Sequence, residues 1–293
     1  MNAKICEVVT ERILEQLKKG VVAWRKPWKG GGIKLPVNLK SMKTYRGINV
    51  FLLLSCGFGS RYWMSFKQCS EAKGKVKAGS KGCPVIFWNW VERMETDKES
   101  GEKKLKRIPF LRYYTVFNLD QIEGVKDPDA SEKIAGPEFN PVAEAEKIVA
   151  GYKDAPKIEY AEQRAYYAPL EDRVNMPMKE SFEKGAEYYS TLFHELAHST
   201  GHESRLDREG VGKPHFFGDE IYSKEELIAE FGAAFLCGMA GIENQTIENS
   251  ASYIEHWSAE FKKDPELLIS SAAKAQKAVD YILGKTFEEA AEK

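Results

Sequence analysis

Two histidines four residues apart flank a glutamate in the segment His194-Glu195-Leu196-Ala197-His198. The apolar spacing in residues 182–193 predicts that this segment continues a helix. Residues i and i+4 of a helix lie on one face, so His194 and His198 can bind a single metal ion. Glu195, next to the first of them, can reach a metal-bound water as general base. The pattern predicts a catalytic site with one Zn²⁺ per chain.

A catalytic zinc site needs a third protein ligand, and the segment at residues 225–235, EELIAEFGAAF, offers one on a second helix. Glu226 and Glu230 are one helical turn apart, so both can face the first helix. We assign Glu226 as the third ligand. We assign Glu230 as the carboxylate that holds a ligand imidazole by its other nitrogen. Two histidines, one glutamate and an open position are typical of a hydrolytic zinc site.

Three alternatives stay open from the residues alone. His202 extends the histidine series, but it lies beyond Gly201, where the helix is expected to end. Glu225 replaces Glu226 as ligand if the second helix is rotated. The two histidines could also lie on a helix that binds no metal. The three-histidine metzincin pattern is disfavoured, because Ser204 stands where its third histidine belongs.

The charge of the chain is divided between its halves, although the formal net charge is −1. Residues 1–125 hold 24 Lys and Arg against 11 Asp and Glu, a net charge of +13. Residues 126–293 hold the remaining 19 Lys and Arg against 33 Asp and Glu, a net charge of −14. This division predicts a basic module for a polyanion joined to an acidic catalytic module.

Composition and pattern predict an α+β protein of two domains. We expect a small basic α+β domain at residues 1–125, a linker rich in Gly, Pro, Asp and Lys at 126–141, and a zincin-like metallopeptidase domain at 142–293. No apolar run is long enough to span a bilayer, and the N-terminus lacks the apolar core of a secretory signal. The five cysteines form no CxxC pair, which favours reduced thiols in the cytoplasm.

The basic half interleaves cations with aromatic residues, and single-stranded nucleic acid is held by these two kinds of side chain. Neither a helix-turn-helix nor a zinc-finger pattern is present, which favours sequence-tolerant binding of single strands. Any one of the tryptophans could instead be a core residue that contacts no nucleic acid. Any one of the lysines could instead lie on a solvated surface. The residues that we assign to nucleic-acid binding are Trp24, Arg25, Lys26, Trp28, Lys29, Tyr45, Arg46, Asn49, Trp63 and Lys67.

The whole chain resembles the ArdC family of antirestriction proteins. The residues that carry the resemblance are Trp24 to Trp28, Tyr45 to Asn49, Trp63, Phe66 to Gln68, Arg164 to Tyr167, Asn175 to Pro177, His194 to His202 and Glu225 to Ala234. The resemblance implies a single-stranded-DNA-binding domain followed by a zincin-like metalloprotease domain. It also implies a host such as a conjugative plasmid, integrative element or phage, whose incoming DNA is shielded from restriction endonucleases.

Two further functions use the same parts. One is a DNA-dependent metalloprotease that removes proteins crosslinked to or stalled on DNA. The other is a protein that only coats single-stranded DNA and carries an inactive zincin site. If the chain is an active peptidase, a strand at Arg164–Ala168 or Arg173–Met176 is expected to hold an extended peptide. Candidates to stabilise the oxyanion are Tyr166, Tyr167, His202 and His215.

Overall fold

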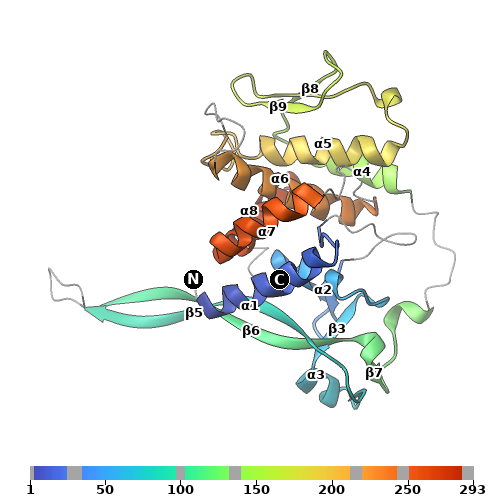
Figure 1. Cartoon of the computed structure of the whole chain (residues 1–293), viewed down its shortest axis with the longest axis vertical. Coiled ribbons are helices and arrows are strands. Elements are labelled where there is room, and N and C mark those ends of the chain that lie inside the picture. Colours follow the sequence, from blue (N-terminus) through green and yellow to red (C-terminus); the bar gives the residue numbers. More distant parts are fainter. Residues whose placement is uncertain are drawn as a thin grey trace.

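The computed structural model describes residues 3–24, 35–96, 103–131, 140–211, 220–242 and 251–285. The predicted mixed α+β fold is confirmed. A five-stranded sheet forms one end of the molecule, a layer of helices fills the middle, and a small three-stranded sheet covers the other end (Figure 1).

The N-terminal half holds three helices and seven strands among its described residues. They are α1 (Ala3–Lys18), β1 (Val37–Asn38), β2 (Lys43–Thr44), α2 (Ile48–Ser55), β3 (Tyr62–Ser65), α3 (Phe66–Glu71), β4 (Lys75–Val76), β5 (Cys83–Thr96), β6 (Lys103–Asn118) and β7 (Ile122–Glu123), with a 3₁₀ turn at Leu119–Gln121. The main sheet has the order β2-β1-β3-β6-β5, and β4 pairs with β7 in a separate ribbon. Strands β5 and β6 form a long antiparallel hairpin whose register runs from Cys83 opposite Val116 to Thr96 opposite Lys103. This hairpin extends beyond the body of the protein (Figure 1).

The C-terminal half places three short strands between helices. Its elements are α4 (Pro141–Gly151), β8 (Lys157–Glu159), β9 (Tyr166–Ala168), β10 (Arg173–Asn175), α5 (Gly185–Ser199), α6 (Glu220–Ala240), α7 (Ala251–Lys263) and α8 (Pro265–Ile282), with 3₁₀ turns at Pro128–Ser131 and Lys179–Ser181. Asn140 caps α4 by accepting hydrogen bonds from the amides of Val142 and Ala143 at 3.1 and 3.2 Å, and a proline follows at the first helical position. Of the predicted linker, residues 132–139 lie outside the described residues.

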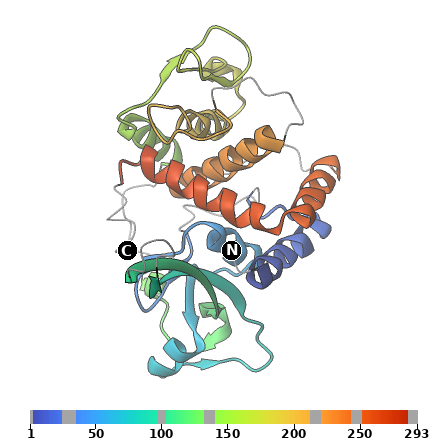
Figure 2. The ribbon, with the colours of Figure 1, turned by 90° about the vertical axis from the view of Figure 1, so that its left-hand side faces the viewer.

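The larger of two hydrophobic clusters among the described residues connects the two halves, and the smaller one lies within the N-terminal half. Helix α1 packs against α7 and α8, so the first helix of the chain lies beside the last two (Figure 2). At the centre, the rings of Phe51 in α2 and Phe235 in α6 stack with centroids 4.8 Å apart. Trp24 meets Phe231 and Phe261 edge to face. The two predicted domains are therefore held together by buried aromatic contacts.

Candidate metal centre and nucleic-acid interface

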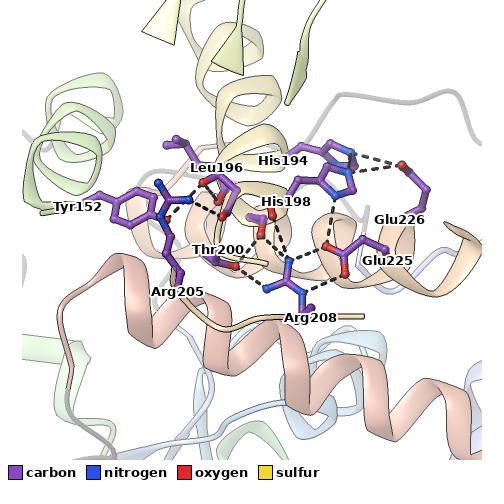
Figure 3. A network of polar contacts seen from close by, with 11 residues as sticks. Tyr152, His194, Leu196, His198, Thr200, Arg205, Arg208, Glu225 and Glu226 are labelled. Atoms are coloured by element: carbon purple, nitrogen blue, oxygen red, sulfur yellow. Dashed lines mark hydrogen bonds and ion pairs between the residues drawn. The ribbon is translucent and has the colours of Figure 1, made fainter. Parts of the chain in front are cut away.

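Helices α5 and α6 bring two histidines and one glutamate together. His194 and His198 project from one face of α5, and their Nε2 atoms are 3.1 Å apart. Glu226, on α6, places its carboxylate oxygens 3.5 Å from Nε2 of His194 and 3.4 Å from Nε2 of His198. Among the described residues, these three form the one group whose His, Cys, Asp or Glu donor atoms all lie within 4.8 Å of one another. Figure 3 shows the three side chains converging.

The spacing of these donor atoms fits a tetrahedral metal site. Bonds of about 2.05 Å to nitrogen and oxygen give ligand atoms roughly 3.3 Å apart on a tetrahedron. The separations found here are close to that value: 3.1 Å between the two Nε2 atoms, 3.5 Å from His194 to Oε2 of Glu226 and 3.4 Å from His198 to Oε1 of the same carboxylate. A neutral imidazole pair and a carboxylate suit Zn²⁺ and other divalent transition metals. The residues present therefore fit the predicted divalent ion.

The two helices pack closely enough to hold this geometry because small residues stand between them. A Cβ atom added at Gly232 of α6 would lie 2.8 Å from Cβ of Ala197 on α5, which is closer than carbon atoms approach. Ala197 is fully buried, so it has no room to withdraw. Gly232 thus sets the distance between the helix with two candidate ligands and the helix with the third.

The carboxylate at the other nitrogen of a candidate ligand imidazole is Glu225, and our assignment of this role to Glu230 was wrong. Oε1 of Glu225 is 3.4 Å from Nδ1 of His198, on the side of the ring away from Glu226. Glu230 instead accepts hydrogen bonds from Nε1 of Trp24, at 3.0 Å, and from the hydroxyl of Tyr253. The adjacent glutamates at 225 and 226 were the sequence signal for a ligand and a carboxylate that holds a ligand imidazole. Which of the two glutamates takes which role depends on the rotation of α6.

Without a metal, the carboxylates around His198 act on its pKa. Burial lowers that pKa, but hydrogen bonds and charge from Glu225 and Glu226 outweigh burial and raise it to about 10. Burial raises the pKa of Glu226, and both histidines together hold it well below its usual range. The surrounding carboxylates thus favour the imidazolium form of His198, and a divalent cation bound to these residues would replace that positive charge.

Glu195, the predicted general base, is a buried residue of α5 that is 8 % exposed. His202, considered above as a third ligand, lies outside the three-residue group. Its Nδ1 is 2.8 Å from the hydroxyl of Ser204 and accepts a hydrogen bond from the Ser204 amide. His215 lies outside the described residues.

The small sheet above α5 decides between the two strands proposed for peptide binding. Its order is β8-β10-β9, so β10 is paired on both sides and cannot accept a further strand. The prediction of the strand at Arg173–Met176 was therefore wrong. Strand β9 lies at an edge of this sheet and packs against α5, which makes it the remaining candidate. The hydroxyls of its tyrosines donate to acidic side chains, Tyr166 to Glu162 and Tyr167 to Asp172.

Four residues predicted to contact DNA are structural. Trp24, Tyr45, Asn49 and Trp63 are all buried, and a buried ring cannot stack on a base. Asn49 closes the edge of the main sheet, because its side-chain amide exchanges two 2.7 Å hydrogen bonds with the backbone of Ile86 on the outermost strand, β5. The prediction that these four residues contact DNA was therefore wrong.

The remaining predicted DNA contacts divide into three groups. Arg46 forms an ion pair with Asp280 of α8, so its charge is partly used inside the protein. The side chain of Lys67 is exposed on α3. Arg25, Lys26, Trp28 and Lys29 lie outside the described residues, and their assignment stays a prediction.

The exposed aromatic residues of the sheet were not predicted. Phe87 on β5 and Tyr114 on β6 are 43 % and 45 % exposed, and their ring centroids are 5.6 Å apart. Arg112 stands directly opposite Phe87 and two residues from Tyr114, so all three side chains share one face. The next residue, Tyr113, is 55 % exposed on the opposite face. Within the sequence, nothing separates these aromatics from the buried ones.

The fold, with the helix pair α5 and α6 that carries the candidate metal ligands, is that of a zincin-like domain joined to a small mixed-sheet domain. Residues 3–117 match the N-terminal domain of anti-restriction factor ArdC, and residues 143–275 match a zincin-like metallopeptidase. The chain belongs to the ArdC family of antirestriction proteins.

Solved structures of a relative support this assignment. The metal-free crystal structure of the antirestriction protein ArdC from plasmid R388 is 36 % identical in sequence, with a TM-score of 0.74 and coverage of 98 % of each chain. The Mn(II)-bound structure of that protein gives a TM-score of 0.75 at 36 % identity, covering 95 % of this chain and 97 % of the other.

Two curated relatives extend the comparison. DNA primase TraC of Escherichia coli is 36 % identical over 94 % of this chain, but the match spans 27 % of the primase. The uncharacterized protein y4eC of Sinorhizobium fredii is 31 % identical over 95 % of this chain and 91 % of its own length. Among the described residues, no helix combines the length and apolar character needed to cross a membrane.

Proposed function

We propose that this chain is an antirestriction protein in which a metal-dependent peptidase is joined to a single-stranded-DNA-binding domain. In this role it protects the incoming DNA of a mobile element in the cytoplasm of the recipient cell. The observation that carries the peptidase part is the convergence of His194, His198 and Glu226 within 4.8 Å. Support for the DNA part comes from the net charge of +13 in residues 1–125 and from relatives that include a DNA primase.

The chemistry assigns separate tasks to the residues of the site. His194, His198 and Glu226 would hold one divalent ion, which we propose to be Zn²⁺ although the R388 relative has been solved with Mn(II). When bound, Zn²⁺ supplies a Lewis acid that polarises a peptide carbonyl and lowers the pKa of water toward ~7. Glu195 takes the proton of the attacking water and passes it to the leaving amine. The open edge of β9 pairs with the backbone of an extended peptide substrate.

The peptidase proposal is tested with Glu195→Gln, which keeps the shape of the side chain and removes the base. We expect the variant to bind one metal per chain as the wild type does, and to lose hydrolysis of a denatured casein or of proteins supplied on single-stranded DNA. Glu187→Gln, an exchange of the same kind in the first turn of the same helix, is the control and should keep full activity. A Glu195→Gln variant that still cleaves peptides would show that the base is another residue.

The alternative functions are separated by the same variant. Protection of DNA from a restriction endonuclease by Glu195→Gln at wild-type level would mean that strand coating alone gives the effect. Loss of protection would connect it to proteolysis. Peptidase activity that appears only with single-stranded DNA present would favour the DNA-dependent protease.

For the DNA part, we propose that bases stack on the face formed by Phe87, Arg112 and Tyr114. Removing both rings, Phe87→Ala with Tyr114→Ala, should weaken binding of a labelled oligo(dT) by about 5–150-fold for each stacked base, the equivalent of ~1–3 kcal/mol. The slope of log affinity against log salt should stay the same, because no phosphate contact is removed. Tyr113→Ala, on the opposite face, is the matched control. Equal affinities of the control and the double variant would refute this placement.

A further inference from the structure

We infer that Arg208 is a positioning residue for the metal site and acts on His198 through Glu225. This inference rests on the proposed metal site. Arg208 lies in the loop after α5, ten residues beyond His198. Its Nη2 donates to the backbone carbonyl of His198 at 3.4 Å, and it acts on the His198 ring by way of the Glu225 carboxylate. No residue spacing in the sequence indicates this role.

Arg208 and Glu225 form a buried ion pair with two hydrogen bonds. Nε of Arg208 donates to Oε2 of Glu225 at 2.9 Å, and Nη2 donates to Oε1 at 2.5 Å. Two parallel hydrogen bonds fix both the position and the plane of the carboxylate. Both side chains are more than nine-tenths buried, at 8 % and 6 % exposed, so water does not compete for these bonds.

The same carboxylate contacts the ring of His198, a candidate ligand. Oε1 of Glu225 also lies 3.4 Å from Nδ1 of His198. A proton held on Nδ1 leaves the lone pair on Nε2, the nitrogen that faces His194 and Glu226. The chain of contacts from Arg208 through Glu225 to His198 thus fixes the tautomer and the orientation of the ring toward the metal (Figure 3).

The end of α5 holds the guanidinium of Arg208 in place. Its other donors reach the end of α5: Nη2 to the carbonyl of Ala197 at 2.8 Å and Nη1 to the hydroxyl of Thr200 at 2.6 Å. A Cβ atom at Gly201 would lie 2.9 Å from Nη2 and 3.0 Å from Cζ of Arg208. Gly201 therefore leaves the space that the guanidinium occupies. The glycine that follows the histidine motif serves this approach, besides ending the helix.

A purely structural role is distinguished by the neighbouring Arg205. This residue is equally buried, donates to the Ser199 carbonyl at the same helix end, and forms a bidentate ion pair with Asp172 at 2.8 Å on both arms. Within the part of the chain that the structure describes, it forms no hydrogen bond or ion pair with Glu225 or with a candidate ligand. If capping the end of α5 were the whole role of Arg208, the two arginines would respond alike to substitution.

The experiment measures metal affinity and coordination on the full chain. Zn²⁺ affinity is determined by chelator competition, and Co²⁺ absorption reports ligand geometry, for wild type, Arg208→Met, Glu225→Gln and Arg205→Met. We expect Arg208→Met and Glu225→Gln each to lose 10–100-fold in Zn²⁺ affinity and to alter the Co²⁺ spectrum. The double variant should be no weaker than the worse single one. Arg205→Met should keep wild-type affinity and spectrum.

Other results would overturn the inference about Arg208 or the proposed metal site itself. Affinity of Arg208→Met within threefold of wild type, or a loss matched by Arg205→Met, overturns the inference. Arg208→Lys keeps the charge without the two-pronged contact, and serves if the methionine variant does not fold; wild-type affinity in it also overturns the inference. A wild-type protein that binds no divalent metal would instead refute the proposed function on which this step rests.

Discussion

Replacing Trp24 with leucine should destabilise the protein and leave its affinity for DNA unchanged. The indole is 1 % exposed, meets three phenylalanine rings edge to face, and donates to Glu230 at 3.0 Å. Truncating a buried tryptophan to alanine costs ~3–5 kcal/mol, and losing a hydrogen bond to a charged group costs ~1.5–3 kcal/mol. Leucine restores part of the apolar contact, so we expect a net loss of about 2–4 kcal/mol.

The assay is urea unfolding followed by circular dichroism. With a slope of ~1–3 kcal/mol per molar urea, the expected loss moves the midpoint down by about 1 M or more at constant slope. Tyr113→Leu, an exposed ring on the sheet, is the control and should leave the midpoint in place. The reasoning is refuted if Trp24→Leu unfolds at the wild-type midpoint while its affinity for oligo(dT) falls by the ~1–3 kcal/mol of one stacked base.

Three more outcomes follow from the structure. The pKa of His198 is raised to about 10 in the metal-free protein, so Zn²⁺ must displace a proton from this ring when it binds. The apparent Zn²⁺ affinity should therefore rise about tenfold per pH unit between pH 6 and 8, with proton release in calorimetry. An affinity that does not change with pH would contradict this. Gly232→Ala gains about 1 kcal/mol of helix propensity but places a methyl group against the buried Ala197. We expect this clash to outweigh the gain and to weaken Zn²⁺ binding in a chelator titration. Gly151→Ala, whose added methyl group would meet no neighbour, is the control and should leave Zn²⁺ binding unchanged. Asn49→Ala leaves the backbone N–H and C=O of Ile86 without these partners and should cost ~2–4 kcal/mol in urea unfolding, with the salt slope of DNA binding unchanged.

The pair of histidines was predictable because its geometry is local. A spacing of four residues on a helix places two side chains on one face whatever the rest of the fold does. The rotation of α6 was not predictable in the same way. Residues 227–238 of that helix are all buried, so no amphipathic stripe shows which side faces α5. The roles of Glu225 and Glu230 could therefore be exchanged without any conflict in the sequence pattern.

For the aromatic residues of the basic half too, the local sequence does not determine which side chains are buried. Trp24 is buried by Phe231 and Phe261, which are more than 200 residues away in the chain, and Phe87 is exposed although it lies in an equally apolar run. Local sequence reports which side chains are aromatic. Which of them are covered depends on contacts between elements that no window of the sequence contains.

Because the two halves share one aromatic core, a gene must carry both halves to give a stable protein. A cut between residues 125 and 142 would expose the faces of Phe51 and Phe235 that now stack on each other, and would separate Trp24 from Glu230. Fragments made at this boundary should aggregate, and neither should retain the properties of the whole chain. Gene rearrangement that kept one half would thus yield an unstable product. The match covers 94 % of this chain within the much longer TraC and 95 % in y4eC, so both relatives carry both halves.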